Sequence, residues 1–217
     1  AWPGGLAALQ RNGVCLVDAQ GREQSFPVRA SSEPGDFAGA RLALVLVKAW
    51  QTQRAAHQIR ACLAPDGIAL SLQNGLGNKE TLSGVLGKSR VGAGVTTTGA
   101  TLLGPGRVRP GGEGQITLGV HPHMMPLANL MERAHFRINY TEDLQALLWG
   151  KLLVNAAINP LTALLRIPNG ELLSRPAANA LMAKTALEVA DVALAQGIRL
   201  PFDAPVSAAT DVARKTA

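Results

Sequence analysis

Two stretches of the chain, LALVLVKAWQ at residues 42–51 and IALSLQNGLGN at residues 68–78, decide the fold. Each opens with a short apolar run, which is typical of a strand buried on both faces of a parallel sheet. Residues 51–63 have a helical pattern, and a second helix over 79–86 leads to a third strand over 90–95. This alternation of strands and helices predicts an α/β fold with a parallel, Rossmann-like sheet.

The residues before and after this unit have patterns that predict hairpins, a helix and a short strand. Residues 14–17 and 24–28 are two short apolar segments joined by a polar, Gly-containing turn, which predicts a β-hairpin. Gly, Thr and Pro become frequent between residues 97 and 120, where we expect an antiparallel hairpin. A helix over 126–135 and a short strand over 136–140 should follow.

The last third of the chain is predicted to be helical. Apolar periodicity indicates helices over 144–165, 176–196 and 206–215, and Gly197 suits the position after a helix C-terminus. We therefore expect two domains. Residues 1–140 form a partial Rossmann-like domain, and residues 141–217 form an all-helical domain.

The composition excludes several classes of protein. Of the 217 residues, 47% are hydrophobic and 17% are charged, so the chain can bury a core and does not resemble a disordered protein. The net charge of +6 is spread along the chain, and aromatic residues make up only 4%, which disfavours a nucleic-acid-binding surface. A positive field favours an anionic small substrate or a phosphate-bearing cofactor.

The cysteines and the most apolar stretch indicate a cytoplasmic protein. Cys15 and Cys62 are far apart and form no CxxC motif, so free thiols in a reducing cytosol are expected. Residues 147–167 reach the length of a membrane span. Because this stretch contains several polar residues, we interpret it as an interior helix and expect no membrane insertion.

A line of polar side chains marks this helix. In residues 147–161, Lys151, Asn155 and Asn159 are the non-apolar residues apart from a Gly and a Pro, and they are spaced four apart. Residues at this spacing share one face of a helix. Buried ammonium and amide groups need partners, because each unsatisfied group costs about 1–3 kcal/mol. A small ligand with an anionic or carbonyl group would satisfy them, and a snorkelling lysine with interhelical amide bonds is the structural alternative.

Four motifs then occur in order along the chain. Val47-Lys48-Ala49-Trp50-Gln51 and Gln73-Asn74-Gly75-Leu76-Gly77 end two strands, Gly94-Val95-Thr96-Thr97-Thr98 ends a third, and residues 149–172 carry the fourth. Together the motifs resemble the ketopantoate reductase (2-dehydropantoate 2-reductase) family. The resemblance implies an NADPH-dependent oxidoreductase that reduces 2-dehydropantoate to pantoate in pantothenate biosynthesis, and hence in coenzyme A biosynthesis.

The resemblance also implies roles for residues of the helical domain. Lys151 would be the general acid that protonates the carbonyl oxygen as hydride reaches the keto carbon. Desolvation on an apolar helix would bring its pKa closer to the working pH. Asn155 and Asn159 would bind substrate hydroxyl and carbonyl groups, and Asn169 would be either a further substrate ligand or a turn residue.

On the sheet domain, the resemblance assigns the cofactor to residues that follow strands. Asn74 would lie at the nicotinamide ribose and Lys48 on the cofactor side of the same cleft, since ligands bind at the carboxyl ends of strands in open α/β sheets. Gln51 and Thr98 are weaker candidates. The His-Pro-His sequence at residues 121–123 is interpreted as a loop, and no metal site is expected.

The sequence lacks one motif of the family, and other functions remain as alternatives. No GxGxxG turn occurs, so we expect a fragment without the N-terminal GxGxxG unit and the C-terminal end, weak or inactive alone. A short natural protein is the alternative. Other functional hypotheses are an oxidoreductase of the 6-phosphogluconate-dehydrogenase-like superfamily acting on another 2-oxo or 2-hydroxy acid, and a non-catalytic remnant serving as a helical interaction domain. A homodimer is possible.

Overall fold

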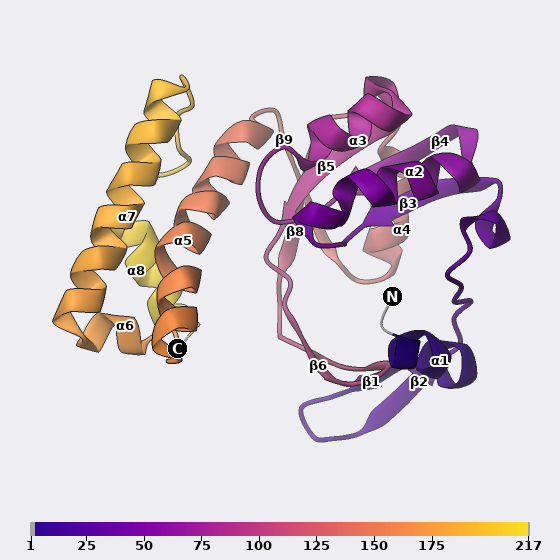
Figure 1. Ribbon diagram of the computed structural model, residues 1–217, viewed down its shortest axis with the longest axis horizontal. Coiled ribbons are helices and arrows are strands. Elements are labelled where there is room, and N and C mark those ends of the chain that lie inside the picture. The colour runs from indigo at the N-terminus through magenta and orange to yellow at the C-terminus, as the bar shows by residue number, and fades with distance from the viewer. Residues whose placement is uncertain (1–2, 217) are drawn as a thin grey trace. The chain divides into compact units, whose positions relative to one another are not determined.

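The computed structural model describes residues 3–216, which form two compact units (Figure 1). The sheet unit extends to Gln73 and resumes over Lys79–Thr141, and the helical unit combines Asn74–Asn78 with the residues from Glu142 onward. The first two residues and the last residue, which fall within the predicted domain limits, lie outside the described part. Each unit has a hydrophobic core of its own.

A five-stranded sheet, counted over residues 3–216, forms the centre of the sheet unit in the order β3-β4-β5-β8-β9. β3, β4 and β5 pair in parallel, β8 is antiparallel to β5, and β9 is parallel to β8. These parallel strands and the helices between them confirm the α/β fold class. The strands are β3 (Ala40–Val45), β4 (Leu63–Ser71), β5 (Val91–Thr96), β8 (Gln115–Gly119) and β9 (Arg137–Thr141).

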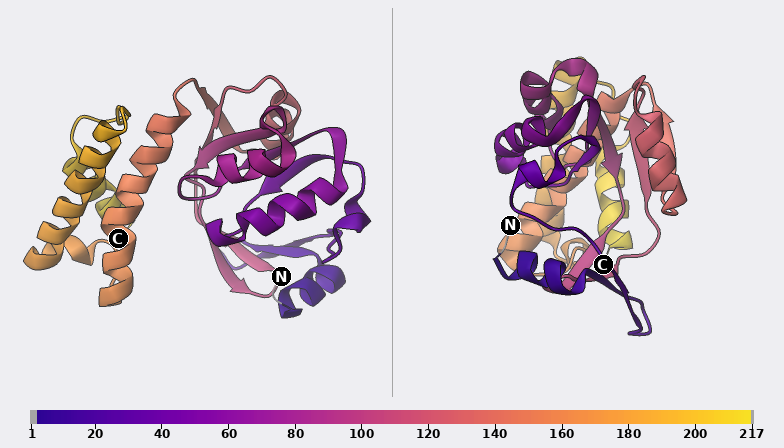
Figure 2. Two further views of the ribbon diagram at one scale, coloured as in Figure 1. Left: turned by 45° about the horizontal axis from the view of Figure 1, so that its top comes forward. Right: turned by 90° about the vertical axis from the view of Figure 1, so that its right-hand side faces the viewer.

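Helices cover both faces of this sheet (Figure 2). On one face, Ala69 of β4 packs in a cluster with residues of α2 (Thr52–Cys62) and α3 (Asn78–Leu86). On the other, Leu70 belongs to a cluster with residues of α4 (Met125–Arg133). Successive residues of a strand point to opposite faces, so β4 supplies both cores.

The edge position of β3 corrects one prediction. Ile68, Ala69, Leu70 and Ser71 of β4 are buried, whereas Leu44 of β3 is 43% exposed. β4 lies between two strands, but β3 pairs only with β4 among the described residues. The apolar run at residues 42–47 therefore predicts a strand correctly, but not burial on both faces.

A second, four-stranded sheet lies within the described residues in the order β2-β1-β7-β6. The predicted hairpin of β1 (Val14–Val17) and β2 (Glu23–Phe26) is confirmed. The hairpin expected over residues 97–120 is shorter than predicted, because only β6 (Ala100–Gly104) and β7 (Arg107–Pro110) pair with each other. β8 instead pairs with β5 in the five-stranded sheet. A helix, α1 (Pro3–Asn12), was not predicted.

The helical unit follows the predicted pattern closely. It contains α5 (Leu144–Leu165), α6 (Glu171–Ser174), α7 (Pro176–Ala195) and α8 (Pro205–Lys215), of which the short α6 was not predicted. α5 begins at Asp143, whose Oδ1 accepts a hydrogen bond from the Ala146 amide at 2.9 Å. Gly197, just after α7, has the left-handed φ of 72° expected beyond a helix end.

Small side chains bring the helices of this unit together. Leu153, Ala157 and Ile158 of α5 pack in one buried cluster with Met182 and Ala186 of α7 and with Ala209 and Ala213 of α8. α5 is long and apolar enough to cross a membrane by length and composition alone. Leu153, Ala157 and Ile158 enter the core of the helical unit, but only 28% of the most apolar window of α5 is buried and Leu164 is 80% exposed. The expectation of an interior helix is therefore met on one side of α5 alone.

Two helical glycines provide a matched test of this packing. A Cβ added at Gly150 of α5 would lie 2.8 Å from Cγ of Pro201 and 3.2 Å from Cε1 of Phe202, whereas one at Gly84 of α3 would have no atom within 4 Å. Ala is favoured over Gly by about 1 kcal/mol in a helix, but overpacking costs about 1–3 kcal/mol. We expect Gly150→Ala to lower the free energy of unfolding and Gly84→Ala to raise it. Urea denaturation followed by circular dichroism measures both, and a stabilising Gly150→Ala would contradict the close packing.

Candidate active site

Lys48 lies three residues beyond the end of β3, where the chain turns into α2. The turn is a short 3-10 helix, Ala49–Gln51, in which the Gln51 amide donates to the Lys48 carbonyl at 2.8 Å. The Lys48 amide in turn donates to the Gln51 side-chain oxygen at 3.3 Å. The Lys48 side chain is exposed, so its ammonium is accessible to an anionic ligand. Gln51 therefore has a local structural role in this turn.

Asn74 begins the turn that follows β4. Gly75 and Gly77 have φ values of 90° and 79°, a left-handed conformation that favours glycine. The Asn78 side chain donates to the carbonyls of Asn74 at 3.1 Å and of Gly75 at 3.4 Å. The glycines and the second asparagine of the QNGLGN sequence thus shape the turn, and the Asn74 side chain is exposed.

Gln73 is a residue whose contribution the sequence did not reveal. Its side-chain nitrogen donates to the Val47 carbonyl at 2.8 Å and to Thr52 Oγ1 at 2.9 Å, and its oxygen accepts from Ser71 Oγ at 3.0 Å. Gln73 therefore links the end of β4 to both sides of the Lys48 turn. A polar residue within the second strand-end motif was the only available signal in the sequence.

The helical unit presents Lys151, Asn155 and Asn159 on one face of α5, as the spacing predicted. Lys151 and Asn155 are half-buried, whereas Asn159 is exposed, so the expectation that all three are buried is wrong for Asn159. Burial lowers the pKa of the Lys151 ammonium below its ordinary value, because the charged form loses hydration. Near Pro160, the Thr162 hydroxyl donates to the carbonyls of Ile158 at 3.3 Å and Asn159 at 3.2 Å.

Asn169 has a structural partner. Its side-chain nitrogen donates to Thr216 Oγ1 at 2.7 Å, and the Thr216 hydroxyl donates to the Val212 carbonyl at 2.8 Å. The bond joins the loop after α5 to the end of α8. Glu171 begins α6 and pairs with Arg175 at 2.7 Å. Asn169 is therefore a loop-tethering residue in this structure, and the bond to Thr216 uses one of the two N–H donors of its amide.

The histidines at residues 121 and 123 contact each other rather than forming part of a larger cluster. Their ring centroids are 5.9 Å apart in an edge-on arrangement. The pKa of His121 is lowered by burial and by the positive charges of His123 and Lys79. Among residues 3–216, no group of three or more His, Cys, Asp or Glu side chains could hold a metal ion.

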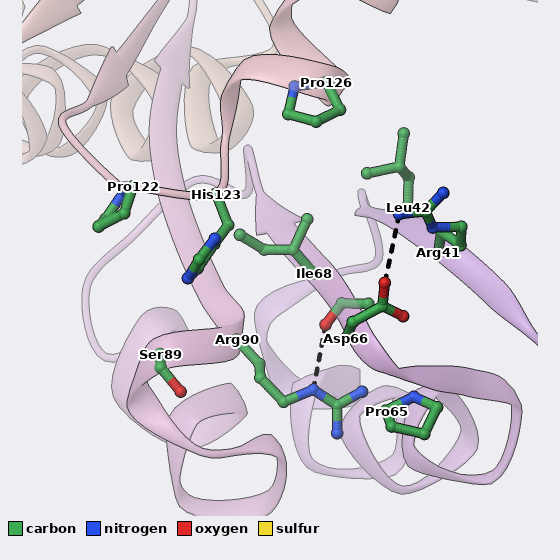
Figure 3. Close-up of a pocket in the computed structure, with 11 residues that line it drawn as sticks. Arg41, Leu42, Pro65, Asp66, Ile68, Ser89, Arg90, Pro122, His123 and Pro126 are labelled. Carbon is green, nitrogen blue, oxygen red and sulfur yellow. Dashed lines mark hydrogen bonds and ion pairs between the residues drawn. The ribbon is translucent and has the colours of Figure 1, made fainter.

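The largest of the described cavities, about 650 Å³, is lined by His123 but by neither Lys48 nor Asn74 (Figure 3). Arg41, Asp66 and Arg90, which line it, lie at or near the amino ends of β3, β4 and β5. Arg41 pairs with Asp66 at 3.2 Å, and Arg90 Nε donates to the Gly67 carbonyl at 3.0 Å. The candidate residues Lys48 and Asn74 follow the opposite, carboxyl ends of β3 and β4. Cavity size therefore does not identify the candidate site.

The family models match both parts of the chain. The model described as ketopantoate reductase PanE/ApbA covers residues 1–123, and the model of the ketopantoate reductase C-terminal region covers residues 143–217. The chain belongs to the ketopantoate reductase family. This membership confirms the resemblance carried by the four sequence motifs.

Individual members of the ketopantoate reductase family show how much of the protein the chain represents. A 2-dehydropantoate 2-reductase of Halobacterium salinarum is 32% identical over 98% of this chain and 71% of its own length. One of Archaeoglobus fulgidus is 36% identical over 71% of this chain. The match to the Archaeoglobus protein covers 52% of that protein's length. The chain thus spans between about half and three quarters of the length of these relatives.

Solved structures show the same fold. A ketopantoate reductase family structure from Ralstonia eutropha has a TM-score of 0.86 at 32% identity, covering 95% of this chain and 68% of its own. A 2-dehydropantoate 2-reductase from Geobacter metallireducens has a TM-score of 0.86 at 29% identity, with 96% and 71% covered. A D-mandelate dehydrogenase complex with NADH and anilino(oxo)acetate, at 21% identity and a TM-score of 0.87 over 97% and 70%, shares the fold alone.

The lowered pKa of Lys151 has a measurable effect on stability. In the unfolded chain Lys151 regains its ordinary pKa of 10.5, so between the lowered folded pKa and 10.5 the unfolded state binds more protons. Stability then rises with pH in that window. We expect the stability of the native chain, relative to Lys151→Met, to increase as the pH rises through it, as measured by urea midpoints across a pH series. Lys184→Met on an exposed position of α7 controls for the loss of one charge, and a pH-independent difference for Lys151→Met would contradict the burial.

Proposed function

We propose that this protein reduces 2-dehydropantoate to pantoate with NADPH, as a cytoplasmic enzyme of pantothenate biosynthesis. The observation that carries the proposal is the half-buried Lys151, whose pKa burial lowers, on one helix face with Asn155 and Asn159. Membership of the ketopantoate reductase family supports it. We assign cofactor binding to the residues that follow β3 and β4, Lys48 and Asn74, and substrate binding to the polar face of α5.

The chemistry assigned to Lys151 follows from the charge that develops in the reaction. When hydride adds to the keto carbon, the carbonyl oxygen gains negative charge and must receive a proton or a hydrogen bond. The Lys151 ammonium donates this proton and becomes a neutral amine. A lysine with an ordinary pKa holds its proton too tightly near neutral pH, so the lowered pKa favours the transfer.

Asn155 and Asn159 orient the substrate in this proposal. Each amide both donates and accepts hydrogen bonds, so it can bind a hydroxyl or a carbonyl oxygen. Positions one and two turns beyond Lys151 keep such groups on the face that carries the acid. Asn169 can join them through its amide oxygen or its second N–H, because its bond to Thr216 uses one N–H alone.

The residues at the strand ends fit a phosphate-bearing nicotinamide cofactor. Lys48 offers an exposed ammonium for a phosphate, and Asn74 offers an exposed amide for a ribose hydroxyl. Both follow parallel strands at their carboxyl ends, where open α/β sheets bind ligands. When bound, NADPH supplies the hydride.

Replacing the acid should reduce turnover. We expect Lys151→Ala to lower kcat by about 100-fold or more, since general acid–base groups contribute roughly 10²–10⁴-fold. NADPH oxidation with ketopantoate, assayed with the protein expressed from its complete open reading frame, measures this. Lys184→Ala removes an exposed lysine of α7 and should leave kcat unchanged. A loss below tenfold for Lys151→Ala would overturn the assigned acid, and better turnover of another 2-oxo acid would overturn the assigned substrate.

The division of binding between the residues that follow the strands and the polar face of α5 can be tested by two asparagine variants. Asn159→Ala should raise KM for the 2-oxo acid by about 10-fold, because one or two hydrogen bonds are lost, and should leave KM for NADPH nearly unchanged. Asn74→Ala should raise KM for NADPH by a similar factor. Steady-state kinetics in both substrates separate these effects, and a reversed pattern would contradict the assignment.

A further inference from the structure

Buried polar side chains are concentrated at the carboxyl end of the parallel strands. Among the residues whose burial is described, 4–216, the buried polar side chains are those of Thr52, Ser71, Gln73 and Asn78. Ser71 ends β4 and Gln73 follows it, while Thr52 and Asn78 are the first residues of α2 and α3. All four therefore flank the two turns that carry Lys48 and Asn74.

The Gln73 side chain forms a hydrogen bond just beyond the point where the regular pairing of β3 and β4 ends. The last paired residues are Val45 and Ser71, and the last backbone bond joins the Leu72 amide to the Val45 carbonyl at 3.3 Å. Beyond this point the Gln73 side chain reaches the Val47 carbonyl at 2.8 Å. A side-chain amide thus continues the connection between the two chain segments up to the residue that precedes Lys48.

The same side chain also fixes the far side of the Lys48 turn. Gln73 donates to Thr52 Oγ1 at 2.9 Å and accepts from Ser71 Oγ at 3.0 Å, so both ends of its amide are satisfied. Val47 and Thr52 bracket the turn that contains Lys48. An apolar side chain could fill this space without the desolvation cost of a buried amide, so packing alone does not account for the glutamine.

We propose that Gln73 is a positioning residue that holds the Lys48 turn in the conformation that binds the cofactor before the cofactor arrives. This inference rests on the proposed function, because it assigns Lys48 and Asn74 to cofactor binding. Asn78 holds the Asn74 turn through its bonds to the Asn74 and Gly75 carbonyls. A turn that is already ordered loses less conformational entropy when a ligand binds.

The role predicts a specific kinetic pattern. Gln73→Met keeps the approximate length of the side chain and removes its hydrogen bonds. It should raise Kd and KM for NADPH by about 10-fold, as expected for the loss of two or three hydrogen bonds that order a binding turn. The kcat at saturating NADPH and the KM for the 2-oxo acid should change by less than about twofold, because Lys151 and the α5 amides are untouched.

Variants at neighbouring positions provide the controls. Gln53→Met makes the same chemical change at an exposed position of α2, one residue beyond Thr52, and should leave the Kd for NADPH unchanged. Thr52→Val removes the hydroxyl that Gln73 contacts, and Thr52→Ser keeps it. We expect about a threefold rise in Kd for Thr52→Val and less than a twofold change for Thr52→Ser, since one hydrogen bond separates them. The Thr52 pair decides the question if Gln73→Met does not fold.

Amide hydrogen exchange gives a readout that is independent of the cofactor. The Gln51 amide bonds to the Lys48 carbonyl inside the turn, and the Val95 and Thr96 region of β5 serves as an internal reference. Gln73→Met should accelerate exchange at Gln51 while exchange in β5 stays the same. Faster exchange together with weaker NADPH binding supports the proposal.

The outcomes separate this inference from the proposed function. If the native protein does not bind NADPH or reduce 2-oxo acids, the proposed function fails and the positioning role fails with it. If the native protein binds NADPH and both Gln73→Met and Thr52→Val bind it within twofold of the native Kd, only the positioning role is overturned. A lower unfolding temperature with an unchanged Kd would show that Gln73 serves stability alone.

Discussion

The parallel pairing of β3 and β4 is the constraint on which the sheet unit depends. Its register, from Leu42 opposite Ile68 to Val45 opposite Ser71, makes the two strands end side by side. Alternate residues of β4 then enter the core beneath α4 and the core beneath α2 and α3. Because both strands run the same way, the segments that follow them, with Lys48 after β3 and Gln73 after β4, leave at the same, carboxyl end of the sheet.

In the helical unit, the constraint is that an apolar helix, α5, carries the half-buried lysine Lys151. Ala157 of α5, Ala186 of α7 and Ala209 of α8 allow close packing on one side of α5. Lys151 lies two residues before Leu153, which is fully buried in that core, and its own side chain is half-buried. The helix is therefore held by alanine and leucine contacts, and the ammonium remains at the border between core and solvent, where burial lowers its pKa without removing it from ligands.

Local patterns predicted the elements well, because helices and hairpins depend on neighbours in the sequence. The bounds of α5 and the β1–β2 hairpin are examples. The edge position of β3 and the pairing of β8 with β5 could not be predicted, since both depend on which distant strand becomes the partner. The same holds within the candidate site. Gln73 meets Val47 across 26 residues of chain and Asn169 meets Thr216 across 47, and spacing does not encode such contacts.

The polar groups that follow the strands and those on α5 differ in how firmly they are fixed, and this difference fits the binding roles proposed for them. At the strand ends, Gln73 is buried with both ends of its amide bonded, and Asn78 is buried and bonded to two turn carbonyls. On α5, exposure increases from the half-buried Lys151 and Asn155 to the exposed Asn159. A turn that is fixed in advance lowers the entropy cost of binding a cofactor. In the proposed reaction, negative charge develops on the carbonyl oxygen of the substrate, and the more exposed amides of α5 have room to adjust their hydrogen bonds as that charge develops.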